Sequence, residues 1–128
     1  VMHIVSEVEG FLKEDMDVWD LLMASFPAGT VTGAPKIRAM QLINDLEHQS
    51  RGPYSGVYGS MDLCGALNTA ITIRTMIVVP SSQEGSDVYV QAGAGVVADS
   101  LSSAEYQETL NKARGMLKAL ACLKGAEL

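Results

Sequence analysis

Aromatic residues and cysteines are scarce in this sequence, and both scarcities limit what the protein can be. Only 5% of its 128 residues are aromatic, and only two are cysteines. Cys64 and Cys122 stand far apart and match no spacing that is typical of a metal site or a redox motif. A disulfide framework and a thiolate metal centre are therefore not expected, and both thiols are predicted to be reduced residues of the core.

Long apolar runs and an excess of positive charge are also absent. No apolar run reaches the roughly 18 residues that a membrane-spanning helix needs. The segment Val1–Val5 is apolar but has neither the basic region nor the cleavage site of a secretion signal. The formal net charge of −6 argues against general affinity for nucleic acid. We therefore expect a cytoplasmic protein that binds neither membranes nor nucleic acid, and that holds any anionic substrate with a few local cations or a metal ion.

What the sequence does contain is the composition of a globular domain. Apolar residues make up 48% of the chain and charged residues 19%, which is typical of a folded protein. A single domain of this length buries roughly 68% of the surface that its unfolded chain exposes, so a hydrophobic core is expected. Because the sequence opens directly on a strand-like segment, we expect the chain to be part of a longer protein.

The apolar periodicity predicts both strands and helices. Strands are expected over 1–12, 54–63, 68–79 and 88–97, and helices over 15–25, 35–47 and 103–124. Strands that are interrupted by helices without strict alternation indicate an α+β fold, with an antiparallel sheet and helices packed on its outer face. Within its strand, Arg74 is expected to face away from the main aliphatic layer.

Small residues fill the segment 91–97, which is the most informative stretch of the chain. Gly93 and Gly95 allow a ligand to approach the backbone closely, with only Ala94 between them. Backbone N–H groups in such a segment are free to meet an anion. The segment therefore predicts a site for an anionic group.

The helix expected over 103–124 begins with two carboxylates and an amine on one face. Glu105, Glu108 and Lys112 stand at positions i, i+3 and i+7. Paired carboxylates can hold a hard cation such as Mg²⁺. The same spacing also fits a capping box that begins at Ser102 and an ordinary ion pair between Glu108 and Lys112. Spacing alone leaves both interpretations open.

Other residues could carry chemistry, and each has an ordinary structural alternative. Arg74 lies in a strand that is otherwise β-branched and apolar, where a bidentate grip on a substrate carboxylate would satisfy its guanidinium. A solvent-facing arginine would produce the same pattern. The loop over 29–36 could present hydroxyl and N–H groups at a helix N-terminus, or simply cap that helix. Tyr54 and His3 fit packing and structural roles as readily as functional ones.

Taken together, these segments resemble the C-terminal part of the chorismate-utilising enzymes, and most of all their anthranilate-forming branch. The matching segments are 1–6, 26–40, 51–56, 71–75, 91–97 and 105–114. The resemblance covers essentially all of the chain. It implies that residues 1–128 form an incomplete, C-terminal portion of a chorismate-binding catalytic domain.

The resemblance also implies which residues contact the substrate. The substrate-binding residues that it implies are Tyr54, Arg74, Gly93, Ala94, Gly95 and Lys112. Among them, Arg74 would bind the pyruvyl carboxylate of chorismate, and the backbone of the glycine segment would cradle the same side chain. Lys112 matches a lysine near the substrate.

A magnesium site and two catalytic residues follow from the same resemblance. Glu108 matches a carboxylate that binds Mg²⁺, and Glu105 would lie close to the metal. His3 matches a histidine that is linked to leaving-group chemistry at the ring. Thr30 matches a loop threonine of the family and is taken as the second catalytic residue.

The implied reaction, of the lyase class, converts chorismate and ammonia to anthranilate and pyruvate in tryptophan biosynthesis. Ammonia would come from glutamine through a glutamine amidotransferase partner. Aminodeoxychorismate synthase, an isochorismate or salicylate synthase, and a non-catalytic fragment stay open as alternatives. The chain departs from the usual pattern of the family at Ser60 and at 65–68. Because the segments that supply the acid/base glutamate and the other Mg²⁺ carboxylates lie upstream, the chain alone is expected to be inactive.

Overall fold

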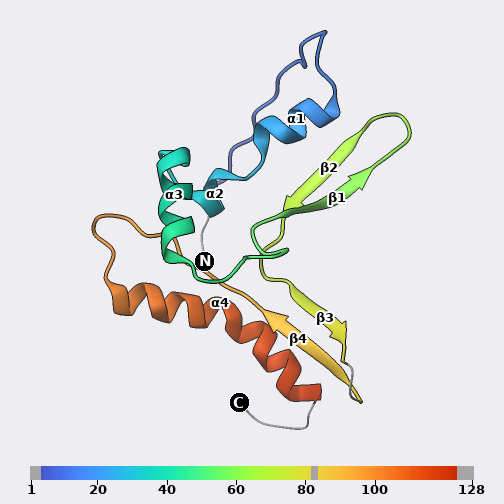
Figure 1. The fold of residues 1–128 in the computed structure, drawn as a ribbon. Coiled ribbons are helices and arrows are strands. Elements are labelled where there is room, and N and C mark those ends of the chain that lie inside the picture. The colour runs from blue at the N-terminus through green and yellow to red at the C-terminus, as the bar shows by residue number, and fades with distance from the viewer. Residues whose placement is uncertain (1–3, 82–83, 124–128) are drawn as a thin grey trace.

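The computed structural model describes residues 4–81 and 84–123, which form four helices and four strands. The helices are α1 (Val18–Ser25), α2 (Gly29–Thr32), α3 (Lys36–Leu46) and α4 (Ser102–Leu123), and the strands are β1 (Val57–Met61), β2 (Leu67–Ile71), β3 (Met76–Pro80) and β4 (Ser86–Val90). In Figure 1, α4 runs beside the hairpin of β3 and β4, whereas α1 and the hairpin of β1 and β2 project away from it. The mixture of helices and antiparallel strands confirms the predicted α+β class.

The strands form two separate antiparallel hairpins. Val57 of β1 pairs with Ile71 of β2, and Met76 of β3 pairs with Val90 of β4. The prediction of one continuous strand over 68–79 is therefore wrong. The chain turns between β2 and β3, where the Ile73 N–H donates to the Ile71 carbonyl at 2.9 Å. Arg74 then adopts a left-handed backbone conformation with φ of 52°, which no regular strand contains.

The strand predicted over 1–12 is not formed by the described residues 4–12. The large apolar side chains of this segment are open to solvent, with exposed fractions of 101% for Ile4 and 105% for Phe11. A strand requires a hydrogen-bonding partner, and within the described part of the chain this segment pairs with none. The strand predicted over 88–97 ends at Val90 for the same reason. Val90 pairs with Met76, the first residue of β3, so residues 91–97 have no strand beside them.

Three of the four described helices, α1, α3 and α4, follow the predicted ranges closely, whereas α2 forms within a segment that was predicted as a loop. α3 agrees with the prediction to within one residue at each end. α1 begins at Val18 instead of residue 15, because the Asp17 carboxylate accepts hydrogen bonds from the N–H groups of Trp19 and Asp20. The Asp20 carboxylate in turn accepts from the Asp17 N–H, which completes a capping box at this point.

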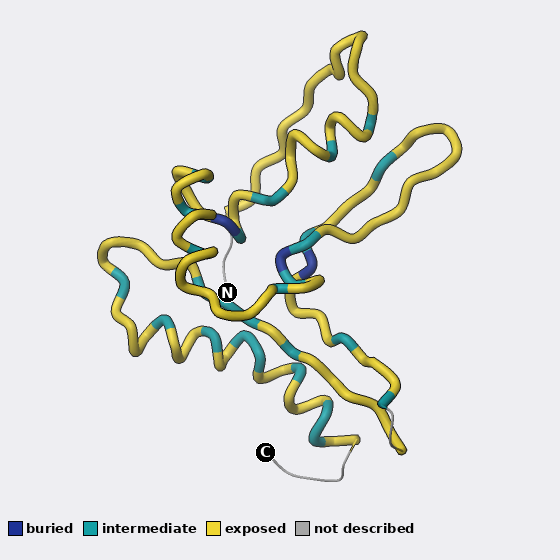
Figure 2. Tube along the Cα trace, in the orientation of Figure 1, coloured by how far each residue is buried: buried dark blue, intermediate teal, exposed yellow. Residues whose placement is uncertain are grey.

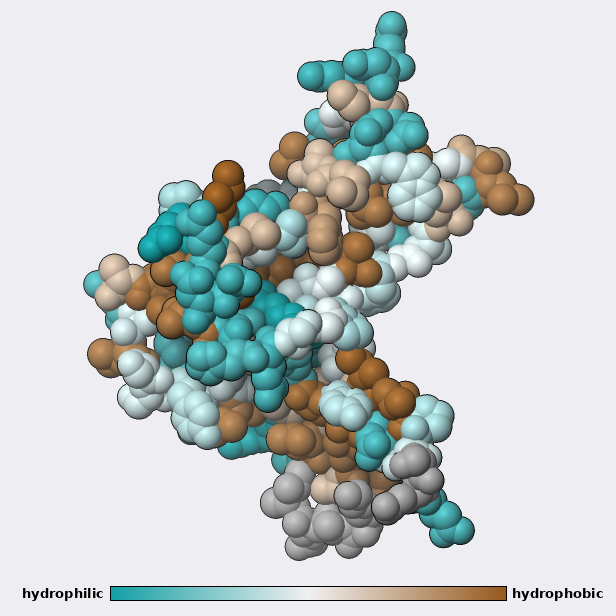
Figure 3. Space-filling model, viewed as in Figure 1, coloured by the Kyte–Doolittle hydropathy of each residue, from teal (hydrophilic) through white to brown (hydrophobic). Residues whose placement is uncertain are grey.

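No hydrophobic residue among those described is buried, so the expected core is absent. The only buried residues in that part of the chain are Thr32, Ser55 and Thr72 (Figure 2). The solvent-accessible surface is 11073 Å², against roughly 6,600 Å² for a compact monomer of this mass. Apolar side chains lie open over the β3–β4 hairpin in Figure 3. Cys64 and Cys122 are free thiols as expected, but both are exposed. The core prediction fails because the apolar faces find no partner within the described chain.

Gly59 is the position where a side chain would conflict most directly with the fold. A Cβ atom there would collide with the Asn68 carbonyl oxygen and lie 2.8 Å from the Thr69 Cα on β2. Gly59→Ala is expected to open the β1–β2 hairpin and to speed amide exchange in both strands by roughly tenfold or more, since overpacking costs about 1–3 kcal/mol. Hydrogen exchange read by mass spectrometry measures this. The neighbouring Ser60→Ala is the control, and unchanged exchange in Gly59→Ala would contradict the expectation.

Candidate functional site

Gly93 is the point where three distant segments of the chain meet. A Cβ atom at Gly93 would lie 2.7 Å from the Tyr54 hydroxyl oxygen, so the tyrosine reaches the backbone only because no side chain is present. On the other side, Lys112 Nζ donates a hydrogen bond to the Gly93 carbonyl oxygen at 2.9 Å. The structure thus brings together Tyr54, Gly93 and Lys112, which the sequence placed in a turn, a small-residue segment and a helix.

Both carboxylates on α4 already have partners in the chain. Glu108 Oε1 accepts from Lys112 Nζ at 2.5 Å. Glu105 Oε1 accepts from the Ser100 hydroxyl at 2.6 Å, and the Ser100 oxygen accepts from the Val97 N–H at 3.0 Å. The expected capping box is therefore not formed, because α4 begins at Ser102 itself and Glu105 instead ties the helix to the end of the glycine segment.

These carboxylates fit a magnesium ion only in part. Glu105 and Glu108 are oxygen donors one helical turn apart, which is the ligand type that Mg²⁺ prefers. In residues 4–81 and 84–123, however, no group of three or more acidic, histidine or cysteine side chains is arranged to hold a metal. Two carboxylates supply at most part of an octahedral shell. A metal bound here would have to draw its other ligands from water, substrate or further protein.

The remaining predicted residues are not brought to Gly93 by any contact. Arg74 is exposed, and within the described chain its guanidinium has no hydrogen bond or ion pair. Thr30 lies exposed on α2. Ala94 is half-buried, and a Cβ atom at Gly95 would meet only open space. His3 lies outside the described residues. The geometry therefore joins one part of the predicted site and leaves Arg74 and Thr30 free.

Arg51 holds a network that the sequence did not reveal. Its Nε and Nη2 atoms donate to the two carboxylate oxygens of Glu47 at 2.7 and 2.6 Å. Its Nη1 atom donates to the Val31 carbonyl at 2.7 Å and to the Ser55 hydroxyl at 3.1 Å. The guanidinium carbon also lies 5.8 Å from the centre of the Tyr54 ring. The four-residue spacing of Glu47 and Arg51 was the available signal, but it falls past the end of α3, where helical spacing no longer predicts contact.

The charges of this network stabilise each other. The hydrogen bond from Arg51 lowers the pKa of the Glu47 carboxyl below its ordinary value, against a smaller opposing effect of desolvation. The hydrogen bond to Glu47 raises the pKa of the Arg51 guanidinium in return. Both groups are therefore ionised over the physiological range of pH.

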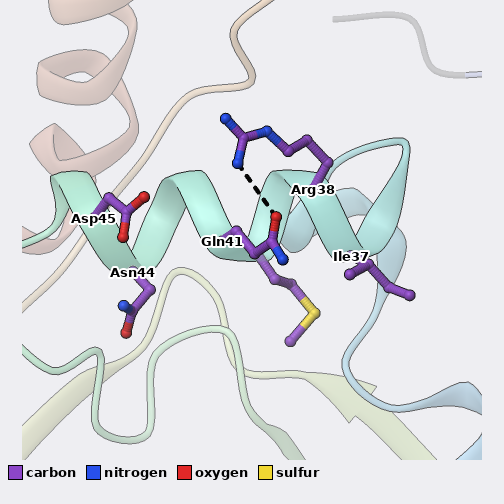
Figure 4. Close-up of a pocket in the computed structure, with 6 residues that line it drawn as sticks. Ile37, Arg38, Gln41, Asn44 and Asp45 are labelled. Carbon is purple, nitrogen blue, oxygen red and sulfur yellow. Dashed lines mark hydrogen bonds between the residues drawn. The ribbon is translucent and has the colours of Figure 1, made fainter.

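Two hollows of the surface lie around α3. One, of about 680 Å³, is lined by Ile37, Arg38, Met40, Gln41, Asn44 and Asp45, and it contains none of the predicted site residues. Figure 4 shows its side chains along this one helix, with Arg38 donating to Gln41 at 3.2 Å. A second hollow, of about 640 Å³, lies between α3 and the turn over 51–55, and both Arg51 and Tyr54 line it. The second is the relevant one, because it is lined by Tyr54, whose hydroxyl approaches Gly93.

Comparison with known proteins gives a consistent result. A family model described as chorismate binding enzyme matches residues 1–118. The chain is similar to anthranilate synthase component 1 of Synechocystis sp., with 63% identity over 123 residues, 96% of this chain and 24% of that protein. The protein of the same name from Aquifex aeolicus is 51% identical over 120 residues, 94% of this chain and 23% of that protein.

A solved structure is also similar. The crystal structure of anthranilate synthase component I from Streptococcus pneumoniae matches with a TM-score of 0.74 and 50% identity, over 84% of this chain and 23% of that one. The chain thus spans about a quarter of the length of the relatives that it matches. Within the described residues, no helix has the length and apolar character that crossing a membrane requires.

Proposed function

The chain belongs to the chorismate binding enzyme family, and on this premise we propose that it forms part of an anthranilate synthase component I. The proposal extends to the whole reaction, in which chorismate and ammonia give anthranilate, pyruvate and water. The observation that carries it is the meeting of Tyr54, Gly93 and Lys112. These residues come from separate segments and converge on a backbone that is bare enough for a carboxylate to approach.

The substrate is a dianion, and the proposed residues suit its two carboxylates. Arg74 has no partner within the described chain, so its guanidinium is available for the enolpyruvyl carboxylate. The backbone over 93–95 would bind the same carboxylate from the opposite side, and the Tyr54 hydroxyl would lie beside that carboxylate. His3 and Thr30 are proposed to act near the ring, where the C4 hydroxyl leaves. Holding both ends of the substrate in this way lowers the entropic part of the barrier.

Mg²⁺ is proposed as the cofactor, held through Glu108 with Glu105 nearby. When bound, it would supply positive charge to the ring carboxylate. Lys112 is proposed to lie beside the substrate, and its contacts with the Glu108 carboxylate and the Gly93 carbonyl oxygen support this placement. A glutamine amidotransferase is the proposed source of ammonia, and the lyase class and a cytoplasmic location are proposed with it.

The test uses the whole gene product that contains this chain. Chorismate, Mg²⁺ and ammonium are supplied, anthranilate is followed by its fluorescence, and all products are separated by chromatography. We expect anthranilate and pyruvate in equal amounts. Aminodeoxychorismate, isochorismate or salicylate would assign the chain to another branch of the family, and no product from chorismate would contradict the proposal.

Magnesium binding by the isolated chain is expected to be weak. Two carboxylates from one helix provide part of a shell, and Glu108 is already neutralised by Lys112, so binding no tighter than the millimolar range is expected. Isothermal titration measures this affinity. Glu108→Gln should remove the remaining heat, whereas Glu84→Gln in the exposed β3–β4 turn should not. A site of micromolar affinity in this chain would show that no further protein ligands are needed.

Gly93→Ala is expected to damage substrate binding more than folding. The new methyl group would stand 2.7 Å from the Tyr54 hydroxyl and force the tyrosine away from the backbone. A misplacement of about 1 Å can cost roughly 100-fold in rate, so kcat/KM for chorismate should fall roughly 10- to 100-fold. Gly115→Ala on α4 is the matched control, because a Cβ atom there meets nothing within 4 Å. Equal kinetics for the two variants would exclude Gly93 from the site.

A further inference from the structure

The side chain of Arg51 makes four hydrogen bonds, and the proposed reaction uses none of them. Its partners lie on three segments: Glu47 at the end of α3, Val31 in α2, and Ser55 in the turn that carries Tyr54. Only 23% of the side chain is exposed. A guanidinium that is held by this many hydrogen bonds has little rotamer freedom. A shift of one of the three segments would therefore displace the other two.

Ser55 shows how strongly the turn depends on this contact. Its φ is 66°, a left-handed conformation that costs a residue with a side chain roughly 1–2 kcal/mol. The residue is nevertheless buried, and it is held from two sides. Its hydroxyl accepts from Arg51 Nη1, and its N–H donates to the Thr72 carbonyl at 2.9 Å. Such a conformation persists only where the surroundings fix it.

Tyr54 is held by its contacts with Arg51 and by its position next to Ser55. Its ring lies under the Arg51 guanidinium, and Ser55 follows it directly in the chain. The direction of the Tyr54 side chain, and therefore the contact between its hydroxyl and Gly93, depends on how Arg51 holds the turn. Through the Val31 carbonyl the same guanidinium also fixes α2, on which the adjacent Thr30 stands.

We propose that Arg51 is a positioning residue: it locks α2 and the turn over 51–55 together, and so sets the Tyr54 hydroxyl against the Gly93 backbone where the substrate carboxylate binds. The inference rests on the proposed function for the identity of that carboxylate. Arg51 itself does not touch the substrate and acts through Tyr54. The planar fork of arginine is needed, because a lysine ammonium can reach the Glu47 carboxylate but cannot also donate to the Val31 carbonyl and the Ser55 hydroxyl.

The test is a double-mutant cycle in the whole gene product. Arg51→Gln is expected to lower kcat/KM for chorismate roughly 100-fold and Arg51→Lys roughly 10-fold, as a displaced contact residue does. Arg38→Gln is the matched control, an exposed arginine with one neutral partner, and should change activity less than about twofold. In a Tyr54→Phe background, Arg51→Gln should cost less than about threefold more, because residues that act as a unit are not additive.

Glu47→Gln provides a second variant if Arg51→Gln does not fold. It keeps a hydrogen-bond acceptor and loses only the charge, so it should give a smaller loss in the same direction and show the same dependence on Tyr54. Wild-type kcat/KM in Arg51→Gln would overturn the proposal. Full additivity with Tyr54→Phe would also overturn it, because a merely structural role would lower the melting temperature and the amount of active protein without such coupling.

A crystal structure of each variant separates this inference from the proposed function. In Arg51→Gln or Glu47→Gln the Tyr54 hydroxyl should leave the Gly93 backbone, whereas in Arg38→Gln it should stay. If the unsubstituted protein produces nothing from chorismate, the proposed function fails, and the structures still decide whether Arg51 positions Tyr54. A Tyr54 that stays in place in Arg51→Gln would refute the positioning role even if the enzyme is active.

Discussion

Arg74→Ala is expected to reduce anthranilate formation by the whole gene product roughly 1,000-fold, which is the scale of removing a charged group that stabilises a reacting anion. Arg74 is exposed and makes no hydrogen bond or ion pair within the described residues. Its removal therefore breaks no contact of the fold described here. The loss of activity should come without a comparable loss of stability.

Steady-state kinetics and thermal melting of the same preparations measure the two effects. Arg38→Ala is the matched control, because it removes an exposed arginine whose one hydrogen bond goes to a neighbour on its own helix. Its activity should stay within about twofold of wild type. Wild-type turnover by Arg74→Ala would show that the carboxylate is held elsewhere, and a melting point that collapses with activity would show that Arg74 is structural.

The isolated 128-residue chain is expected to have no detectable turnover and to associate with itself. It offers the carboxylates of Glu105 and Glu108, but among the described residues no group of three or more acidic, histidine or cysteine side chains is arranged to hold a metal. General acid–base assistance alone is typically worth about 10²–10⁴-fold. Its exposed apolar residues, among them Ile4, Phe11, Leu63 and Leu123, are far more numerous than a stable monomer presents.

Light scattering after gel filtration, together with the anthranilate assay, tests both parts of this expectation. The whole gene product is the control and should be active and of defined size. Turnover by the isolated chain would mean that an acid/base group has been overlooked within these residues. A stable monomer that binds no hydrophobic dye would mean that the apolar faces close on one another in solution.

Local patterns predicted the helices well, because their signals lie within a few residues. α3 agrees with its predicted range to within one residue at each end. The start of α1 was placed three residues early because the cap at Asp17 was not foreseen, and the short helix α2 lies in a segment that was predicted as a loop. The strands were harder, because pairing depends on partners that are distant in sequence. The apolar pattern of residues 4–12 predicted a strand, but this segment pairs with no other strand in the described chain. The β-branched residues around Arg74 predicted a continuous strand, although the chain turns there.

The sequence predicted which residues belong to the candidate site, but not which of them contact one another. Small residues indicated that Gly93 would accept a close neighbour, and helical spacing placed Glu108 beside Lys112. Nothing in the spacing of Tyr54 or Lys112 showed that both would reach the same peptide. Arg51 was overlooked for a similar reason, since three of its hydrogen bonds go to a carboxylate and a hydroxyl whose approach depends on the turn, and the fourth reaches 20 residues back to Val31.

The left-handed backbone at Ser55 and Arg74 has a consequence for mutational libraries. Glycine adopts this conformation without the steric penalty of a side chain, so glycine at either position should relieve strain that the natural residue carries. A library that is selected only for abundance of folded protein should therefore enrich glycine at 74, whereas at 55 the loss of the hydrogen bond from Arg51 offsets part of the gain. A library that is selected for growth through the enzyme's product should keep arginine at 74 and a hydroxyl at 55. The two selections would then favour different residues, most clearly at 74. The difference in enrichment measures how much folding stability is lost by keeping the residue that the activity requires.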